Sequence, residues 1–149
     1  ETIEKLSRQQ QEVLAPQLNA AVEQRFLRLC QRRYEEVKSD PDFQVWVRET
    51  DTGELRSVEN LSRGAQDQIY FSLRFGILDL VSNETESCPS LLDEPFAAFD
   101  RPRLIEAFEI LKEEARSRQL ILFTCREDLL ELARSCDAAI IELTNLQPA

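Results

Sequence analysis

The stretch that decides the fold lies at residues 89–95 and reads Pro-Ser-Leu-Leu-Asp-Glu-Pro. Two apolar residues, Leu91 and Leu92, are followed directly by two carboxylates, Asp93 and Glu94. This pattern is typical of a short buried strand with acidic side chains at its carboxyl end. In a nucleotide-hydrolysing site, the first carboxylate holds Mg²⁺ and the second orients and deprotonates the attacking water. The alternative is an acidic loop after a strand, which is common, so the motif needs support from its surroundings.

Two further motifs flank this stretch. Upstream, residues 61–66 read Leu-Ser-Arg-Gly-Ala-Gln and stand directly before a predicted helix. The Ser62 hydroxyl and the close backbone approach that Gly64 permits would form an anion site at the helix N-terminus. The simpler interpretation is that Ser62 only caps the helix. Downstream, residues 96–100 read Phe-Ala-Ala-Phe-Asp and follow the carboxylate pair without a gap.

Strands alternate with helices around these motifs, which predicts βαβ units, an α/β fold and a mostly parallel sheet. The predicted strands are residues 91–92, 120–123 and 138–143. One predicted helix follows Gly64, and two more cover residues 103–116 and 127–135. Residues 83–89 are predicted to form a loop.

The N-terminal part is predicted to be helical over residues 1–36 and to be the end of a coiled coil. Pro16 is expected to break or restart this helix. From residue 17 to about 34, Val22, Phe26 and Leu29 share one apolar face. Between residues 40 and 58 the apolar period changes to two, with a turn at 51–53, which predicts a β-hairpin edge.

Composition sets further limits. The 149 residues are 42% hydrophobic and 31% charged, as expected for one globular domain, and no apolar run is long enough to span a bilayer. A net charge of −10 argues against a surface that grips nucleic acid over its whole extent. The absence of His excludes His-based metal sites and catalytic triads. The absence of Met indicates that the sequence is a piece of a longer chain. The four cysteines are widely scattered, which predicts reduced thiols.

In this order, the three motifs resemble the C-terminal lobe of an ABC-type ATPase head of the SMC/RecF-like branch. This branch holds DNA-repair and chromosome-organisation ATPases with long coiled coils, and the sequence is most similar to its bacterial YhaN-like members. The resemblance covers residues from about Phe26 to the C-terminus. It implies a P-loop NTPase head lobe for residues 37–149, with residues 1–36 as the coiled-coil stub.

The resemblance also implies roles for individual residues. Asp93 matches the Walker B ligand of Mg²⁺, Glu94 the general base, and Asp100 the D-loop aspartate that helps to align two half-sites. The signature motif, whose Ser and Gly contact the γ-phosphate of ATP bound by the opposite head, is matched by Ser62, Arg63, Gly64 and Gln66.

Two departures from the family pattern matter. The phosphate loop GxxxxGK[ST] is absent, since none of the lysines follows a glycine, and in the family it lies in a distant N-terminal lobe. Family members also carry a His just beyond the strand matching 120–124. Here Arg126 is assigned to that switch position, although an ungapped count selects Cys125. An Arg keeps a donor for a phosphate oxygen but cannot shuttle a proton. The alternative is that Arg126 is an exposed residue at a helix start.

The implied function is that of an ATPase, as half of a head that dimerises around ATP and drives a coiled-coil machine for DNA repair or chromosome maintenance. Expected cofactors are ATP and Mg²⁺. Expected partners are the N-terminal Walker A lobe of the same parent protein and a second head in a homodimer, with DNA contacting only the assembled head. We expect a cytoplasmic location, with association with the bacterial nucleoid as a further option. The alternative is a non-catalytic dimerisation module, against which the presence of both Asp93 and Glu94 argues.

Three arginines form one stripe of the predicted N-terminal helix. Arg25, Arg28 and Arg32 fall within residues 24–33, which contain no acid. Such a stripe would suit DNA phosphates, but the overall acidity favours a merely solvated helix face.

Overall fold

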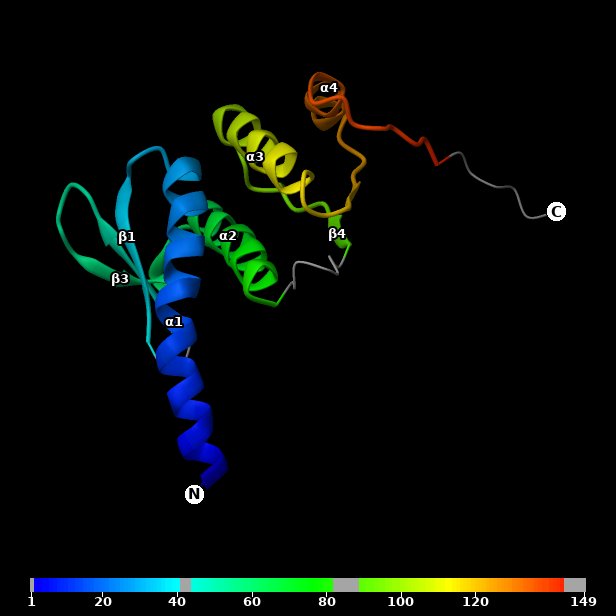
Figure 1. The fold of residues 1–149 in the computed structure, drawn as a ribbon. Coiled ribbons are helices and arrows are strands. Elements are labelled where there is room, and N and C mark those ends of the chain that lie inside the picture. The colour runs from blue at the N-terminus through cyan, green and yellow to red at the C-terminus, as the bar shows by residue number, and fades with distance from the viewer. Residues whose placement is uncertain (1, 41–43, 82–88, 144–149) are drawn as a thin grey trace.

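The computed structural model describes residues 2–40, 44–81 and 89–143 (Figure 1). The elements in chain order are α1 (Thr2–Leu29), β1 (Tyr34–Ser39), β2 (Val45–Glu49), β3 (Leu55–Ser57), the 3₁₀-helix η1 (Val58–Asn60), α2 (Arg63–Val81), β4 (Ser90–Asp93), α3 (Arg101–Glu114), β5 (Leu120–Phe123) and α4 (Glu127–Ser135). The N-terminal part of α1 projects away from every other element (Figure 1). This mixture of helices and strands confirms the predicted α/β class.

The first helix differs from the prediction at two points. It runs unbroken through Pro16, although a proline inside a helix costs about 3 kcal/mol. The rest of this helix compensates by packing, because Val22 and Phe26 are fully buried beside α2 and β1. It also ends at Leu29, so the prediction of a helix is wrong over residues 30–36, and residues from Tyr34 onward form a strand instead.

The first sheet is antiparallel and has the order β1-β2-β3. The predicted hairpin is confirmed, since β2 pairs with β3 across the turn at residues 50–52 and Val47 lies opposite Arg56. Strand β1 was not predicted. It pairs with β2 through an irregular register between Tyr34 and Glu36. Because of this irregularity, the buried residues Tyr34 and Val37 are three apart, a spacing that looks helical in the sequence.

The second sheet is the predicted parallel one, but among the described residues it contains only β4 and β5, paired from Ser90 and Leu120 to Asp93 and Phe123. Helices α2, α3 and α4 confirm the predicted helices. The predicted strand at 138–143 is wrong, because this segment has no ladder to any described strand. A strand exists only through its pairing, whatever its own apolar content. The predicted loop over 83–89 lies outside the described residues except for Pro89.

Two hydrophobic clusters hold the molecule together. One joins α1 and the N-terminal part of α2 to the antiparallel sheet, and the other gathers phenylalanines from α2, α3 and the segment after β4. Helices α1 and α2 approach closely at Gly76, where a Cβ atom would lie 2.8 Å from Val22 Cγ2. Glycine is therefore needed at this crossing, since a larger residue would force the two helices apart.

The arginine stripe of α1 joins the helices by ion pairs. Arg25 binds Glu114 of α3 at 2.5 Å and Asp79 of α2 at 2.6 Å, and Arg118 shares both acids. Arg28 binds Glu106 and Glu113 of α3. Arg25 and Arg28 are thus engaged within the molecule, which neither the DNA-contact nor the solvated-face interpretation foresaw.

The described cysteines, Cys30, Cys125 and Cys136, are free thiols, as predicted, and Cys88 lies outside the described residues. Within residues 2–40, 44–81 and 89–143, no helix combines the length and the apolar character that crossing a membrane requires.

Candidate functional site

The candidate site lies at the carboxyl ends of β4 and β5, where the chain turns sharply at Glu94. The backbone of this residue has φ of 40°, a left-handed conformation that is uncommon for a side chain other than glycine. Its amide donates to the Phe123 carbonyl at 3.0 Å, which continues the β4–β5 pairing by one residue. A backbone conformation of this kind persists only where the surroundings enforce it, and it is frequent at functional sites.

The turn between β5 and α4 holds the Glu94 carboxylate at both oxygens. The Thr124 hydroxyl donates to Oε2 at 3.0 Å, and the Cys125 amide donates to Oε1 at 2.5 Å. These hydrogen bonds, with that from the Cys125 amide first, lower the pKa of Glu94 below its ordinary value. Glu94 is therefore fixed in orientation and ionised at neutral pH.

Asp93 precedes Glu94 and ends β4 with an exposed side chain. Its side chain makes no hydrogen bond or ion pair to any described residue, so its carboxylate oxygens are available to a ligand. Mg²⁺ is commonly held by one or two protein carboxylates together with substrate phosphates and water. An isolated, solvent-facing carboxylate beside a fixed one fits that use, and the described residues contain no ready-made cluster of three His, Cys, Asp or Glu ligands.

Arg126, the predicted switch residue, points its guanidinium at the protein. Its Nη1 donates to the Phe96 carbonyl at 2.7 Å, and its Nε and Nη2 bind both carboxylate oxygens of Asp128 at 3.0 and 2.6 Å. Its amide donates to Thr124 Oγ1 at 3.1 Å. Arg126 thus ties the start of α4 to the segment after Glu94, and in this arrangement Cys125 is the residue whose backbone and thiol face Glu94.

The predicted signature residues gather at the N-terminus of α2. Ser62 caps the helix weakly, with its Oγ 3.4 Å from the Ala65 amide, and both Ser62 and Arg63 are exposed. The Gln66 side chain donates to the carbonyls of Val58 and Glu59 at 3.1 Å, which fixes the entry to the helix. These residues form one exposed, ordered turn.

The signature turn and the segment after Glu94 are adjacent in space. A Cβ atom at Gly64 would stand 3.3 Å from the Ala98 carbonyl, so glycine allows this approach. Two residues further on, Asp100 caps α3 by accepting from the Arg103 amide at 3.1 Å and pairs with the Arg103 side chain. The structure therefore brings the 62–66 and 96–100 motifs together and gives Asp100 a visible structural role as a helix cap.

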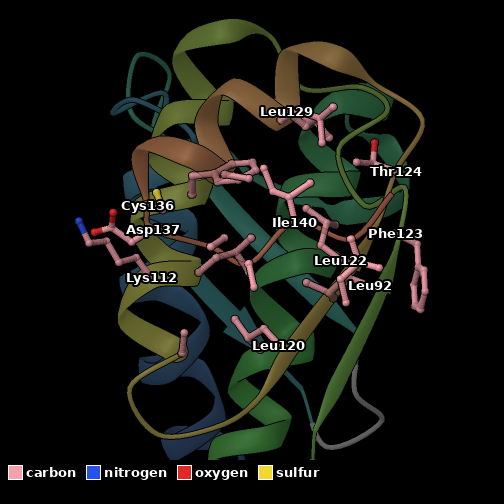
Figure 2. A pocket seen from close by; sticks show the side chains of 18 of the residues that line it. Leu92, Lys112, Leu120, Leu122, Phe123, Thr124, Leu129, Cys136, Asp137 and Ile140 are labelled. Atoms are coloured by element: carbon pink, nitrogen blue, oxygen red, sulfur yellow. The ribbon is translucent and has the colours of Figure 1, made fainter. Parts of the chain in front are cut away.

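One face of the β4–β5 pair is uncovered. Leu91, Ile121 and Phe123 point to this face, and Leu91 is 62% exposed. The opposite face lines an apolar cavity of about 1050 Å³ that also borders α3, α4 and residues 138–143. Figure 2 shows Leu92, Leu122 and Leu129 converging there from three elements, with Phe123 pointing away. Both faces of this small sheet are thus incompletely packed.

Sequence reasoning missed Thr124 and Cys125 as the residues that hold Glu94. The only available signal was their position directly after a predicted parallel strand, where side chains meet those at the end of the neighbouring strand.

No protein-family model matches the chain. The curated "Uncharacterized protein YhaN" of Bacillus subtilis (strain 168) is 32% identical over 99 residues, which is 65% of this chain and 10% of that protein. The chain therefore spans about a tenth of the length of this relative.

Solved structures with a similar fold are SMC head domains. The Smc head of Pyrococcus furiosus, bound to the C-terminal domain of ScpA, superposes with a TM-score of 0.61 at 15% identity, covering 78% of this chain and 30% of that one. The SMC head of Thermotoga maritima superposes with a TM-score of 0.57 at 16% identity, covering 84% of this chain and 44% of that one. A structure from work on ATP-driven dimerization and DNA-stimulated activation of SMC ATPases superposes with a TM-score of 0.59 at 15% identity. It covers 83% of this chain and 78% of that one. The chain therefore has the fold of part of an SMC head domain, which confirms the resemblance to the C-terminal lobe of such a head.

Proposed function

We propose that this chain is half of an ATP-hydrolysing head in which Glu94 is the general base and Asp93 the ligand of Mg²⁺. The observation that carries this proposal is the Glu94 carboxylate, held at both oxygens beside an unpaired Asp93 where two parallel strands end. When bound, ATP and Mg²⁺ supply the phosphoryl group and the charge that neutralises the phosphates.

Glu94 would act mainly by orienting water. A carboxylate has about four lone-pair positions, and two are taken by Thr124 and Cys125, so it can still accept a hydrogen bond from the attacking water. Because its pKa is lowered, Glu94 stays ionised at working pH but is a weak proton acceptor. Fixed orientation of the water is the larger contribution that this geometry supports.

The uncovered face of β4–β5 supports the need for a second lobe. The chain contains no phosphate loop, and the apolar face formed by Leu91, Ile121 and Phe123 adjoins Asp93. A lobe that covers this face would bring its phosphate-binding loop next to the two carboxylates. We therefore place the Walker A lobe of the same parent protein on this face.

A second head would meet the N-terminus of α2. Ser62 and Arg63 are exposed there, and the positive end of a helix of 19 residues favours an anion. In this arrangement ATP would join two heads, and its hydrolysis would release them. A role in DNA repair or chromosome maintenance follows from the resemblance to SMC-like proteins and from the projecting helix α1, which would continue into a coiled coil.

The test is steady-state ATP hydrolysis by the parent protein that carries this lobe. Glu94→Gln is expected to slow turnover by at least about 100-fold, the usual contribution of a general base. Asp93→Asn should raise the Mg²⁺ concentration required for turnover. The matched control is Glu109→Gln, an exposed acid of α3, which should leave hydrolysis unchanged.

Two outcomes would contradict the proposal. One is a wild-type protein that does not hydrolyse ATP, and the other is a Glu94→Gln protein that hydrolyses it at the wild-type rate. The first result would favour the non-catalytic dimerisation module, and the second would show that Glu94 is not the general base.

A further inference from the structure

Arg126 joins the three segments that meet at Glu94. Its Nη1 donates to the Phe96 carbonyl at 2.7 Å, in the segment after β4. Its Nε and Nη2 donate to the two carboxylate oxygens of Asp128, in the first turn of α4, at 3.0 and 2.6 Å. Its backbone amide donates at 3.1 Å to the hydroxyl oxygen of Thr124, which directly follows β5. The position of Arg126 is thus fixed by both its side chain and its backbone.

The contact with the Phe96 carbonyl holds the sharp turn at Glu94 from its far side. The near side is held by the Glu94 amide, which donates to the Phe123 carbonyl at 3.0 Å. Between these two hydrogen bonds lie the left-handed backbone of Glu94, with φ of 40°, and Pro95, whose ring fixes its own φ. A left-handed residue other than glycine persists only where its surroundings enforce that conformation. The Arg126 side chain supplies one of the enforcing contacts.

The backbone of Arg126 also directs the proton of the Thr124 hydroxyl. A hydroxyl carries one proton, and its oxygen can accept from other donors. The Thr124 oxygen accepts from the Arg126 amide, so its proton is donated to Glu94 Oε2, 3.0 Å away. The Cys125 amide, which donates to Glu94 Oε1, lies between these two residues in the chain. Both donors to the Glu94 carboxylate therefore belong to a turn whose end is fastened by the Arg126 side chain.

The surroundings of the Arg126 guanidinium do not favour direct binding of a phosphate. Each of its three nitrogens already donates a hydrogen bond. Asp128 pairs with it through both carboxylate oxygens, a charge-assisted arrangement that is among the strong hydrogen bonds in proteins. A phosphate would have to compete with this carboxylate for a guanidinium whose charge is already paired.

We propose that Arg126 is a positioning residue, which fastens the Glu94 turn to the start of α4, and that it is not a ligand of phosphate. This role differs from the phosphate-sensing role that the resemblance to ABC-type heads implies for the same position. The effect of Arg126 on the geometry of Glu94 does not depend on ATP hydrolysis. Its effect on turnover rests on the proposed function of Glu94, because a misplaced general base slows the chemical step without weakening ATP binding.

The first test is a pH titration of the chain without nucleotide, followed by NMR at the Glu94 carboxyl carbon. Arg126→Lys keeps the positive charge but cannot hold both oxygens of Asp128 and the Phe96 carbonyl at once. The pKa of Glu94 should therefore rise towards its ordinary value, although the charge at position 126 is unchanged. The matched control is Arg134→Lys, at an exposed arginine in the last turn of α4, which should leave the titration unchanged.

A second variant, Asp128→Asn, separates geometry from charge. Removal of a neighbouring negative charge would by itself lower the pKa of Glu94, whereas release of the Arg126 side chain should raise it. A rise in this pKa therefore reports a change in geometry. The matched control is Glu131→Gln, which removes the charge of an acid of α4 that pairs with Arg101 at 3.5 Å. This control should not raise the pKa of Glu94.

Steady-state ATP hydrolysis by the parent protein gives the functional readout. Arg126→Lys and Asp128→Asn should each lower kcat by about 10- to 100-fold and leave KM for ATP within about twofold of the wild type. A phosphate ligand predicts the opposite for Asp128→Asn, since the freed guanidinium would bind ATP more tightly and lower KM.

The proposal is overturned if both variants keep the fold, as judged by their NMR spectra, and Glu94 titrates in them as in the wild type. A lower KM in Asp128→Asn with an unchanged Glu94 titration would assign Arg126 to the phosphate instead. If the wild-type parent protein does not hydrolyse ATP, the proposed function fails, and the two Glu94 titrations still decide whether Arg126 positions this carboxylate.

Discussion

The two halves of the molecule differ in how completely they bury their apolar surface. In the N-terminal half, α1 and α2 close over the antiparallel sheet, and Phe26, Val47 and Ile69 are fully buried. In the C-terminal half, the sheet has two strands among the described residues, β4 and β5, and leaves Phe123 42% and Leu91 62% exposed. The first half completes its own core, whereas the second does not.

This difference coincides with the position of the proposed site. The incomplete half carries Asp93 and Glu94 at the edge of its uncovered face, and the chain has no phosphate loop of its own. The uncovered apolar face and the proposed site therefore coincide. An exposed apolar patch next to fixed polar groups is characteristic of an interaction site rather than of a finished surface.

The largest expected effect separates the two halves directly. Phe26→Ala should destabilise the chain by about 3 to 5 kcal/mol, the usual cost of removing a buried phenyl ring. Phe123→Ala, at the same residue type on the uncovered face, should change stability by less than about 0.5 kcal/mol. Urea unfolding followed by circular dichroism measures both. Equal losses in the two variants would show that the β4–β5 face is covered within the chain.

The next effect concerns the ion pairs that join the halves. Arg25→Ala should lower the free energy of unfolding by about 2 kcal/mol. This loss is smaller than that expected for a buried charge left without any partner, because Arg118 remains beside Glu114. Arg63→Ala is the matched control, since the pair of Arg63 with Asp67 is exposed and should contribute less than about 0.5 kcal/mol. Chemical unfolding tests this, and an Arg25 variant as stable as the control would contradict a stabilising role for the cluster.

The smallest effect sharpens the description of the incomplete half. Thr124→Val removes the hydrogen bond to Glu94 Oε2 and should raise the pKa of Glu94 part of the way to its ordinary value, since the larger cause, the Cys125 amide, remains. An NMR titration of the Glu94 carboxyl carbon measures this. Thr52→Val, which removes a Thr–Glu hydrogen bond in the β2–β3 turn, should leave the Glu94 titration unchanged.

The sign of the pH effect follows from the lowered pKa of Glu94. The stabilisation that this carboxylate gives the folded chain is present above the ordinary Glu pKa and is lost as the pH falls through the folded-state pKa. In Thr124→Val this loss should be smaller and should be complete at a higher pH, because the folded-state pKa is raised while the unfolded-state pKa is unchanged. A loss at the same pH in both proteins would show that the Thr124 hydroxyl does not support the ionised form.

Local patterns predicted most of the helices and the β4–β5 pair. Helix α4 was predicted with its observed bounds because its apolar period and its acidic first turn agree. Strand β1 was missed because its irregular pairing places Tyr34 and Val37 at a helical spacing. The strand predicted at 138–143 failed for the opposite reason, because apolar content alone does not supply a neighbouring strand.

The candidate site was predictable only in part. Asp93, Glu94 and the Ser62 turn stand out by residue type and order, and their functional roles remain predictions. The residues that hold Glu94 do not stand out, because Thr124 and Cys125 approach it only through strand pairing. The inward orientation of Arg126 likewise depends on Asp128 and on the Phe96 carbonyl, a contact between distant parts of the chain.

The most direct test of the half-head is ATP-dependent dimerisation of the head formed by this chain and its Walker A lobe. Light scattering after size exclusion would give the mass of the Glu94→Gln head with and without ATP and Mg²⁺. The proposal predicts that the mass doubles with ATP and that adding Ser62→Arg restores the monomer. A folded Glu94→Gln head whose mass does not change with ATP would contradict it.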